Sequence, residues 1–279
     1  MTDAILRYAA FTDHPDGGNP AGVVLDASAL DDARMQAIAA EVGYSETVFL
    51  RERADGEFDA RYFSPQIEVP FCGHATIAGA VALAEQRGSG TLALHTRAGL
   101  VSVETQRRDS AITATLTSVP PHVEASLPAD LLDQILARLG WNADELDPAL
   151  PARVAYAGAS HLIIAAATRE RLAALDYDFA GLRDLMLAHD LTTVDLIWRE
   201  SALRYHARNP FPVGGVVEDP ATGAAAAAFG AYLRELRLVE PPARIAILQG
   251  EDMGRPSHLV VDIGAAGPIR VSGQAVRLA

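Results

Sequence analysis

The sequence contains no lysine, and all 23 of its basic residues are arginines. Pyridoxal phosphate enzymes and lysine-dependent aldolases form a Schiff base on a lysine, and the phosphate-binding P-loop also requires one. The absence of lysine therefore excludes these three classes of protein.

Cysteine is almost as scarce, because Cys72 is the single example in 279 residues. One cysteine cannot form an intramolecular disulfide, and such cysteine usage is typical of a reducing compartment, so we expect a cytoplasmic location. Long apolar runs are missing as well. No stretch of 18 apolar residues occurs, and we predict no membrane-spanning segment.

The common cofactor and metal motifs are also absent. The sequence has no P-loop, no GxGxxG, GxSxG or HExxH motif, and no paired cysteines that would ligate zinc. The histidines show no spacing that is typical of metal ligands. We therefore predict no metal site and none of the cofactors that these motifs bind.

Basic residues are fewer than acidic ones, 23 against 36, and the net charge is −13. Nucleic-acid-binding proteins present basic faces, so we predict no nucleic-acid partner. An anionic ligand would need a local source of positive potential in such a chain.

What the sequence does contain is a series of short periodic segments. The spacing predicts helices over residues 30–42, 73–85, 127–139, 169–175, 179–190 and 220–236. Alternation and apolar runs predict strands over residues 8–11, 21–25, 45–50, 58–63, 92–94, 100–104, 111–116, 154–156, 161–167, 193–198, 203–207, 245–248, 258–263, 268–271 and 275–278.

The most unusual stretch is residues 218–228, which read EDPATGAAAAA. Asp219 followed by Pro220 is typical of a helix start, because aspartate caps backbone N–H groups and proline suits the first helical position. We therefore predict a helix from Pro220 to Leu236, with Glu218 exposed to solvent before it. A helix of small apolar residues is expected to be buried, with its N-terminus available to an anion.

The two halves of the chain repeat each other. RYFSP at 61–65 leads to FCGHAT at 71–76 and a small-residue helix, and RNPFP at 208–212 leads to PATGA at 220–224 and a second one. Phe63 and Phe211 lie 148 residues apart, as do Cys72 and Pro220, and this constant offset indicates internal duplication. We predict an α+β fold of two similar lobes, each a mostly antiparallel curled sheet or half-barrel around a central alanine-rich helix. Residues 1–118 form the first lobe and residues 119–279 the second, and the last strand is a candidate to cross back to the first.

The two helix starts are predicted to bind the ligand. In a pseudo-twofold arrangement both N-termini would face the cleft between the lobes, where ligands commonly bind. Each carries about half a positive charge and free N–H donors, so the pair would hold a small carboxylate without lysine or arginine. The alternative is that water or loop atoms cap each helix. A small anionic substrate is the predicted partner.

Four side chains are candidates for chemistry. Asp219 is a candidate acid or base, although helix capping explains it equally well. His74 titrates near neutrality in the first turn of its helix, and the repeat aligns it with Thr222. Cys72 is a candidate proton-transfer thiol, but a lone cysteine is more often buried packing. Glu46 begins an apolar strand, where desolvation would raise its pKa into the range of a general base, unless the strand start is exposed.

Five motifs occur in order along the chain: GNPAGVV at 18–24, YSETVF at 44–49, RYFSP at 61–65, FCGHAT at 71–76 and EDPATGA at 218–224. In this combination the sequence resembles the phenazine biosynthesis PhzF-like isomerase family over essentially its whole length. The resemblance implies a diaminopimelate epimerase-like fold of two lobes, with the site between them. It also implies cofactor-free proton transfer at carbon, and a homodimer.

The resemblance further implies roles for individual residues. Glu46 is implied as the general acid/base, and His74 and Asp219 as residues that assist the substrate. The motifs and helix starts supply the substrate-binding candidates, which are Asn19, Ser45, Gly73, Ala75, Thr222, Gly223 and Ala224.

Two positions depart from the patterns of the related enzymes. Ala224 stands where the phenazine enzyme has a serine, so one of its substrate hydrogen bonds would be missing here. Pro220 stands where diaminopimelate epimerase has its second catalytic cysteine. A racemase mechanism with two thiols is therefore excluded.

Three hypotheses follow from the sequence. The first is an isomerase in which Glu46 moves a proton between carbons of a small carboxylate, cyclic or conjugated. The second is an amino-acid or hydroxy-acid racemase or epimerase that uses Glu46 and Cys72. The third is a non-catalytic module that binds a small anion or a protein partner. The position of Glu46 relative to the helix starts discriminates among them.

Overall fold

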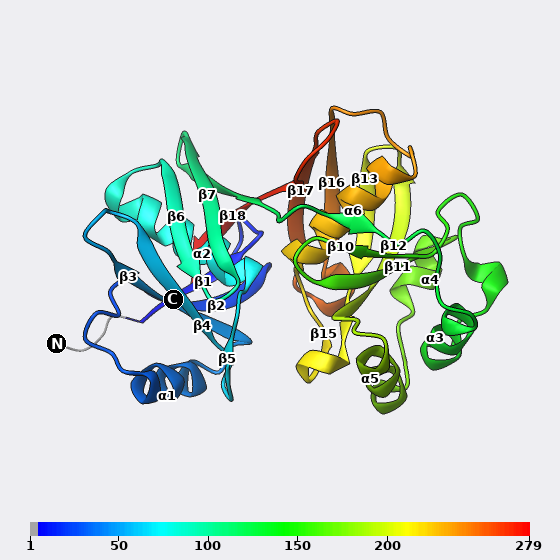
Figure 1. Cartoon of the computed structure of the whole chain (residues 1–279), viewed down its shortest axis with the longest axis horizontal. Helices are drawn as coiled ribbons and strands as arrows, with labels where there is room; N and C mark the ends of the chain where they lie inside the picture. Colours follow the sequence, from blue (N-terminus) through cyan, green and yellow to red (C-terminus); the bar gives the residue numbers. More distant parts are fainter. Residues whose placement is uncertain (1–4) are drawn as a thin grey trace. The chain divides into compact units, whose positions relative to one another are not determined.

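Figure 1 shows the computed structural model of the chain, which describes residues 5–279. The chain divides into two compact units: unit 1 comprises Met1–Thr117 and Ser272–Ala279, and unit 2 comprises Ser118–Val271. Across residues 5–279, none of the helices combines the length and the apolar character that a membrane crossing requires.

Unit 1 is a closed mixed barrel of eight strands. In barrel order they are β1 (Leu6–Ala10), β2 (Asn19–Val24), β3 (Glu46–Glu52), β4 (Phe58–Phe63), β6 (Thr91–Thr96), β7 (Gly99–Arg108), β8 (Ala111–Thr117) and β18 (Arg270–Arg277). The barrel closes because β1 pairs with both β2 and β18. The β2–β3 and β4–β6 pairings are parallel, and β1–β2, β3–β4, β6–β7 and β7–β8 are antiparallel. The predicted half-barrel is therefore complete in this unit.

Helix α2 (Gly73–Arg87) occupies the inside of this barrel. Every residue from His74 to Ala84 is buried, and most of them are alanine or glycine. An eight-stranded barrel has room for little more than small side chains around an internal helix. At Gly79 a Cβ atom would lie 3.1 Å from Val48 Cγ1, so the helix and β3 are already in contact.

The outside of unit 1 carries a smaller core. Helix α1 (Asp32–Val42) begins at the N-cap Asp31 and ends at Gly43, which adopts a left-handed φ of 72°. Its buried Ile38 and Ala39 pack with Phe49 and Phe63 of the barrel wall. The short strand β5 (Glu68–Val69) extends the wall beside β4. Glu46 lies at the start of β3, a few residues after this helix ends.

Unit 2 has a seven-stranded sheet. Its order is β17 (Ser257–Ile263), β16 (Ala243–Gln249), β13 (Arg204–Arg208), β12 (Thr193–Ser201), β11 (Ser160–Ala166), β10 (Arg153–Tyr156) and β9 (His122–Val123). Helix α6 (Gly223–Glu235) contacts β17 at one end of the order and β9, β10 and β11 at the other, so the sheet curls around it. Figure 1 shows α6 in orange among these strands.

The other face of the unit 2 sheet carries a separate core. Apolar residues of β11 and β12 pack there against α3 (Leu131–Leu139) and α5 (Phe179–Ala188). The short helix α4 (Arg169–Ala173) also contacts these two strands. A two-stranded hairpin, β14 (Pro210–Phe211) with β15 (Val216–Glu218), leads into α6.

Several sequence predictions need correction. Helix α6 begins at Gly223 with Thr222 as its N-cap, so the prediction that Asp219 caps a helix starting at Pro220 is wrong. The Asp219 carboxylate instead accepts a hydrogen bond from the Thr222 hydroxyl at 2.6 Å. Glu218, predicted to be exposed, is 8% exposed and forms two hydrogen bonds with the guanidinium of Arg208.

The observed limits of other helices and strands are closer to the predicted ones. Strand β4 has the predicted limits, whereas α3 begins at Leu131, four residues after the predicted Leu127. The two predicted strands at 268–271 and 275–278 are one strand, β18. Its first two residues belong to unit 2 and the others to unit 1.

The helix starts also correct the register of the repeat. The N-caps of α2 and α6 are Cys72 and Thr222, which lie 150 residues apart (222 − 72) and not 148. In this alignment Thr222 is the counterpart of Cys72, and Ala224 that of His74. The two additional residues lie between the strands and the start of α6.

Candidate active site

Glu46 is the first residue of β3, and its side chain is only 18% exposed. Burial raises the pKa of this carboxyl above its ordinary value, while hydrogen bonds from Ser45 and Cys72 act in the opposite direction. Across the parallel β2–β3 pair Glu46 lies opposite Ala21, and the next residue, Thr47, lies opposite Gly22, where a Cβ would lie 2.4 Å from Thr47 Oγ1. The glycine thus allows the two strands to approach closely where Glu46 begins.

His74 lies in the first turn of α2 and is buried. Its Nδ1 lies 3.2 Å from the amide nitrogen of Asn19, and its Nε2 lies 3.3 Å from Ser45 Oγ. The same Nε2 is 3.4 Å from the Glu46 carboxylate. Polar contacts from β2, from β3 and from the residue preceding β3 therefore fix the orientation of the imidazole.

Cys72 is the N-cap of α2, with extended backbone dihedrals, but its side chain does not cap the helix. The thiol donates toward Glu46 Oε2 at 3.5 Å and lies 3.4 Å from His74 Nδ1. Its carbonyl oxygen accepts from Thr76 Oγ1 at 2.6 Å, and that hydroxyl also meets the buried Tyr62 hydroxyl at 2.7 Å. These bonds hold the helix start rigidly against the barrel wall.

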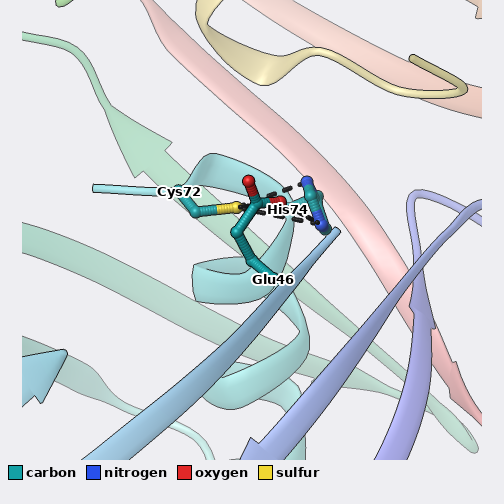
Figure 2. A group of neighbouring side chains, drawn as sticks. All are labelled: Glu46, Cys72 and His74. Atoms are coloured by element: carbon teal, nitrogen blue, oxygen red, sulfur yellow. Dashed lines mark hydrogen bonds and ion pairs between the residues drawn. The ribbon is translucent and has the colours of Figure 1, made fainter. Parts of the chain in front are cut away.

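Figure 2 shows Glu46, Cys72 and His74 directed toward one another at the start of α2. One ligand-type atom from each lies within 4.8 Å of the others. A carboxyl whose pKa is raised toward neutrality, next to an imidazole and a thiol, is suited to accept a proton and return it. We call these three residues the unit 1 trio.

The candidates in unit 2 form a different network around the start of α6. Gln249, at the end of β16, is 2% exposed and uses both ends of its amide. Its Nε2 donates to the Asp219 carbonyl at 2.8 Å and to Thr222 Oγ1 at 3.1 Å, and its Oε1 accepts from the Thr222 N–H at 3.1 Å. Since Thr222 in turn donates to the Asp219 carboxylate, Gln249 fixes the loop that carries Asp219.

The sequence reading missed Gln249, and the available signal was weak. Gln249 is the last residue of the apolar strand segment IAILQ, and it precedes Gly250, which has a left-handed φ of 76°. A Cβ at Gly250 would come within 2.8 Å of the Pro220 carbonyl oxygen, so this glycine allows the loop to approach β16.

A second buried polar group in unit 2 also escaped the sequence reading. Asp195 on β12 is 2% exposed and accepts a hydrogen bond from Asn209 Nδ2 at 2.8 Å. Burial raises the pKa of Asp195 to about 8. The Asn209 carbonyl accepts from the N–H of Asp219 at 3.0 Å, which links this pair to the same loop. The signal was an acidic residue inside the apolar segment TVDLIW.

The structure thus divides the predicted site residues between the units. In unit 1 it brings together Asn19, Ser45, Glu46, Cys72 and His74, with Gly73 and Ala75 in the same helix turn. In unit 2 it places Asp219, Thr222, Gly223 and Ala224 around the start of α6. The prediction that both helix starts serve one site stays a prediction.

The sequence matches a family of known proteins. The family model for phenazine biosynthesis-like proteins, PhzC-PhzF, matches residues 8–279. The chain belongs to this family. A relative within PhzC-PhzF, the trans-2,3-dihydro-3-hydroxyanthranilate isomerase of Pseudomonas aeruginosa, is 33% identical over 279 residues, which cover 97% of this chain and 95% of that enzyme. Isomerisation is the class of reaction that this relationship supports.

Solved structures extend the PhzC-PhzF likeness to the fold. A PhzF-family phenazine biosynthesis protein of Bacillus anthracis matches with a TM-score of 0.88 at 23% identity, over 99% of this chain and 96% of that one. A probable proline racemase of Agrobacterium radiobacter matches with a TM-score of 0.67 at 13% identity, over 99% and 91% of the two chains. The fold of this chain is therefore similar to that of a probable proline racemase as well.

Proposed function

We propose that this protein is a cofactor-independent isomerase that moves a proton between two carbons of a small carboxylate with a cyclic or conjugated skeleton. The observation that carries the proposal is the burial of Glu46 beside His74 and Cys72 at the start of α2. Desolvation raises the pKa of Glu46, and a carboxyl titrating closer to neutrality transfers protons more effectively in both directions.

The proposed step conserves atoms and electrons. The Glu46 carboxylate takes a proton from an activated carbon, and the C–H bonding pair enters the conjugated system of the substrate. The resulting carboxylic acid then returns the proton to another carbon of that system. The step consumes no oxidant, reductant or group carrier.

His74 and Asp219 are assigned supporting roles in this proposal. His74 is positioned to hydrogen-bond the carboxyl group of Glu46 or the substrate, because its Nε2 lies 3.4 Å from Glu46 Oε2. Asp219 is proposed to assist the substrate from the loop that Gln249 holds. The N–H groups at Gly73–Ala75 and at Gly223–Ala224 are proposed to bind the substrate carboxylate.

The test is deuterium incorporation from D2O into candidate substrates, starting with trans-2,3-dihydro-3-hydroxyanthranilate, on which the relative acts. We expect Glu46→Gln to lower the exchange rate by roughly 10²–10⁴-fold, since this is the usual contribution of a positioned acid or base. Asp219→Asn is expected to have a smaller effect.

A matched control is available on the surface of unit 1. Glu57 also contacts a histidine, His95, but both side chains are substantially exposed. Glu57→Gln should therefore exchange deuterium at the wild-type rate. Full exchange in the Glu46→Gln variant would refute Glu46 as the base.

One observation favours a racemase or epimerase as a second candidate. The Cys72 thiol lies 3.5 Å from Glu46, so the two could act as an acid and a base on a single stereocentre. Cys72→Ala would then abolish exchange, whereas the isomerase proposal predicts a mild loss. The non-catalytic binding module receives less support, because Glu46 is buried beside a helix start.

The predicted homodimer completes the proposal. Light scattering coupled to size-exclusion chromatography should give a mass of twice 29.5 kDa. A monomer at micromolar concentration would contradict it without affecting the chemistry proposed for Glu46.

A further inference from the structure

We propose that the unit 1 trio is also a binding site for a thiophilic divalent cation of the Zn²⁺ type, and that the bound ion reversibly blocks the acid–base group. The binding part of this inference stands on geometry alone. The blocking part rests on the function proposed above for Glu46.

The distances among the three ligand atoms match a zinc coordination sphere. Cys72 Sγ lies 3.5 Å from Glu46 Oε2 and 3.8 Å from His74 Nε2, and these last two atoms are 3.4 Å apart. Zinc binds sulfur at about 2.3 Å and nitrogen or carboxylate oxygen at about 2.0 Å, in tetrahedral geometry. Ligand atoms at tetrahedral angles then lie about 3.5 Å apart when one is sulfur and about 3.3 Å apart otherwise. These three distances fit one ion, but Cys72 Sγ also lies 3.4 Å from His74 Nδ1. The imidazole would therefore have to turn about its side-chain bonds to direct Nε2 at the ion.

The donor set also suits such a cation chemically. Cysteine, histidine and a carboxylate are the three side chains that proteins use for zinc, and three protein ligands leave a fourth position open. Thiolate and carboxylate together bring two negative charges. The start of α2 contributes about half a positive charge, which opposes the ion less than the ligands attract it and also favours the thiolate.

The surroundings of His74 provide the outer partner that a metal-bound histidine needs. With Nε2 on the metal, Nδ1 carries the proton and requires an acceptor. The Asn19 side-chain amide lies 3.2 Å from Nδ1, and rotating this amide by half a turn presents its oxygen there. Amide oxygen and nitrogen are assigned from such networks, and the metal-bound form would require the orientation that directs the Asn19 oxygen at Nδ1.

Within residues 5–279, no other three histidine, cysteine or acidic side chains bring their ligand atoms within 4.8 Å of one another. His206 shows the contrast. It contacts Glu251 through Nδ1 and Glu200 through Nε2, so its two carboxylates lie on opposite sides of the ring and cannot share an ion with it. His206 therefore supplies a matched control.

The binding test uses the full chain after treatment with a chelator, titrated with Co²⁺ and then with Zn²⁺ in competition. We expect intense visible bands of tetrahedral cobalt and a near-ultraviolet charge-transfer band from the thiolate, both displaced by one equivalent of Zn²⁺. Cys72→Ser should remove the charge-transfer band, and Cys72→Ser and His74→Gln should each weaken Zn²⁺ binding by about 100-fold or more. Loss of an outer partner alone already costs about 10–100-fold. His206→Gln should bind as the wild type does.

The wild-type cobalt spectrum needs no variant, so a variant that fails to fold leaves the test intact. A weak octahedral spectrum without the thiolate band, or unchanged Zn²⁺ affinity in the folded Cys72→Ser protein, would overturn the site. Where deuterium exchange is observed, one equivalent of Zn²⁺ should stop it and a chelator should restore it. Exchange that continues with the site filled would overturn the blocking role, and absence of exchange in any preparation would count against the isomerase but not against the metal site.

Discussion

The two units surround equivalent helices but equip their N-termini differently. At the start of α2, unit 1 gathers titratable side chains: a carboxyl, an imidazole and a thiol. At the start of α6, unit 2 has one carboxylate, Asp219, which accepts from the Thr222 hydroxyl, and a neutral amide, Gln249, fixes the same loop. The two helix starts therefore differ in their chemistry: unit 1 brings three titratable side chains into mutual contact, whereas unit 2 holds a carboxylate within a hydrogen-bonded loop.

A second pair of features shows the same divergence. Each unit has a strand arginine that binds a glutamate through two hydrogen bonds: Arg61 of β4 with Glu68, and Arg208 of β13 with Glu218. In unit 2 both side chains are below 10% exposed, whereas Arg61 is 28% exposed. Glu68 also binds Arg97, at 2.7 Å. The unit 2 pair is therefore isolated in a buried site, and the unit 1 pair belongs to a surface network.

The largest stability effect should come from separating the buried pair. Arg208→Gln leaves Glu218 buried without its cation, which typically costs about 3–5 kcal/mol in the free energy of unfolding. Arg61→Gln should cost about 1 kcal/mol or less, because Glu68 keeps Arg97 and solvent screens the site. Urea unfolding of both variants measures the contrast. Equal losses would show that the two pairs are energetically equivalent.

The next prediction concerns Asp195, whose substitution should stabilise the protein in a pH-dependent way, whereas the loss of Arg208 destabilises it. The folded-state pKa of Asp195, about 8, lies above its unfolded value near 3.8, so folding favours the protonated form. Its contribution to stability is complete below pH 4 and is lost as the pH rises toward 8. We expect Asp195→Asn to remove this loss and to stabilise the protein at pH 7 by roughly 2–4 kcal/mol.

Urea unfolding of Asp195→Asn and wild type at pH 5 and pH 8 tests this sign. The difference between the two proteins should increase with pH. Asn209 is placed to pair with the new amide, because its Oδ1 has no hydrogen-bond partner in the wild-type structure. A variant that is less stable than the wild type at pH 8 would contradict the assignment of Asp195 as a neutral buried acid.

The smallest predicted effect concerns the space around α2 and α6, which two glycine-to-alanine substitutions compare. A Cβ on Gly230 of α6 would lie 2.8 Å from Val261 Cγ1 and 3.0 Å from Ile269 Cγ2, whereas one on Gly79 of α2 meets nothing closer than 3.1 Å. Gly230→Ala should therefore destabilise by about 1–3 kcal/mol through overpacking. In Gly79→Ala the better helix propensity, worth up to about 1 kcal/mol, should offset the tighter contact. Thermal unfolding midpoints of the two variants measure this difference, and a stabilised Gly230→Ala protein would show that unit 2 has spare room.

Much of the fold was accessible from local patterns. The strand at Phe58–Phe63 and the start of α2 at Gly73 follow from alternation and from a run of small residues. The start of α6 was predicted three residues too early. The local pattern of Asp219 before Pro220 favours a helix start, but Gln249, 30 residues later, binds this segment in a non-helical conformation. The Gln249 amide donates to the Asp219 carbonyl, and the Thr222 hydroxyl donates to the Asp219 carboxylate, so the chain becomes helical only at Gly223. No local pattern includes that tertiary contact.

The candidate site was predictable residue by residue but not as a geometry. Glu46, Cys72 and His74 were each recognisable from their positions at a strand start and a helix start. Their mutual distances depend on α2 lying inside a closed barrel with β2 and β3 parallel, and neither Glu46 nor Cys72-x-His74 has a recognised ligand spacing. The proposed cation site was not predictable from the sequence, because its three ligands meet only through tertiary packing and match no metal-binding motif.

Strand β18 has a consequence for the order of synthesis. It pairs with β1 through Tyr8, Ala9 and Ala10, so the barrel of unit 1 is closed by residues that follow unit 2 in the sequence. A ribosome has translated all of unit 2 before that strand exists. During synthesis β1 therefore has an unpaired edge until β18 is made, and the barrel of unit 1 closes only after unit 2 has been translated. We expect a chain shortened before Ser272 to keep unit 2 folded while its first half exposes a sheet edge that favours aggregation.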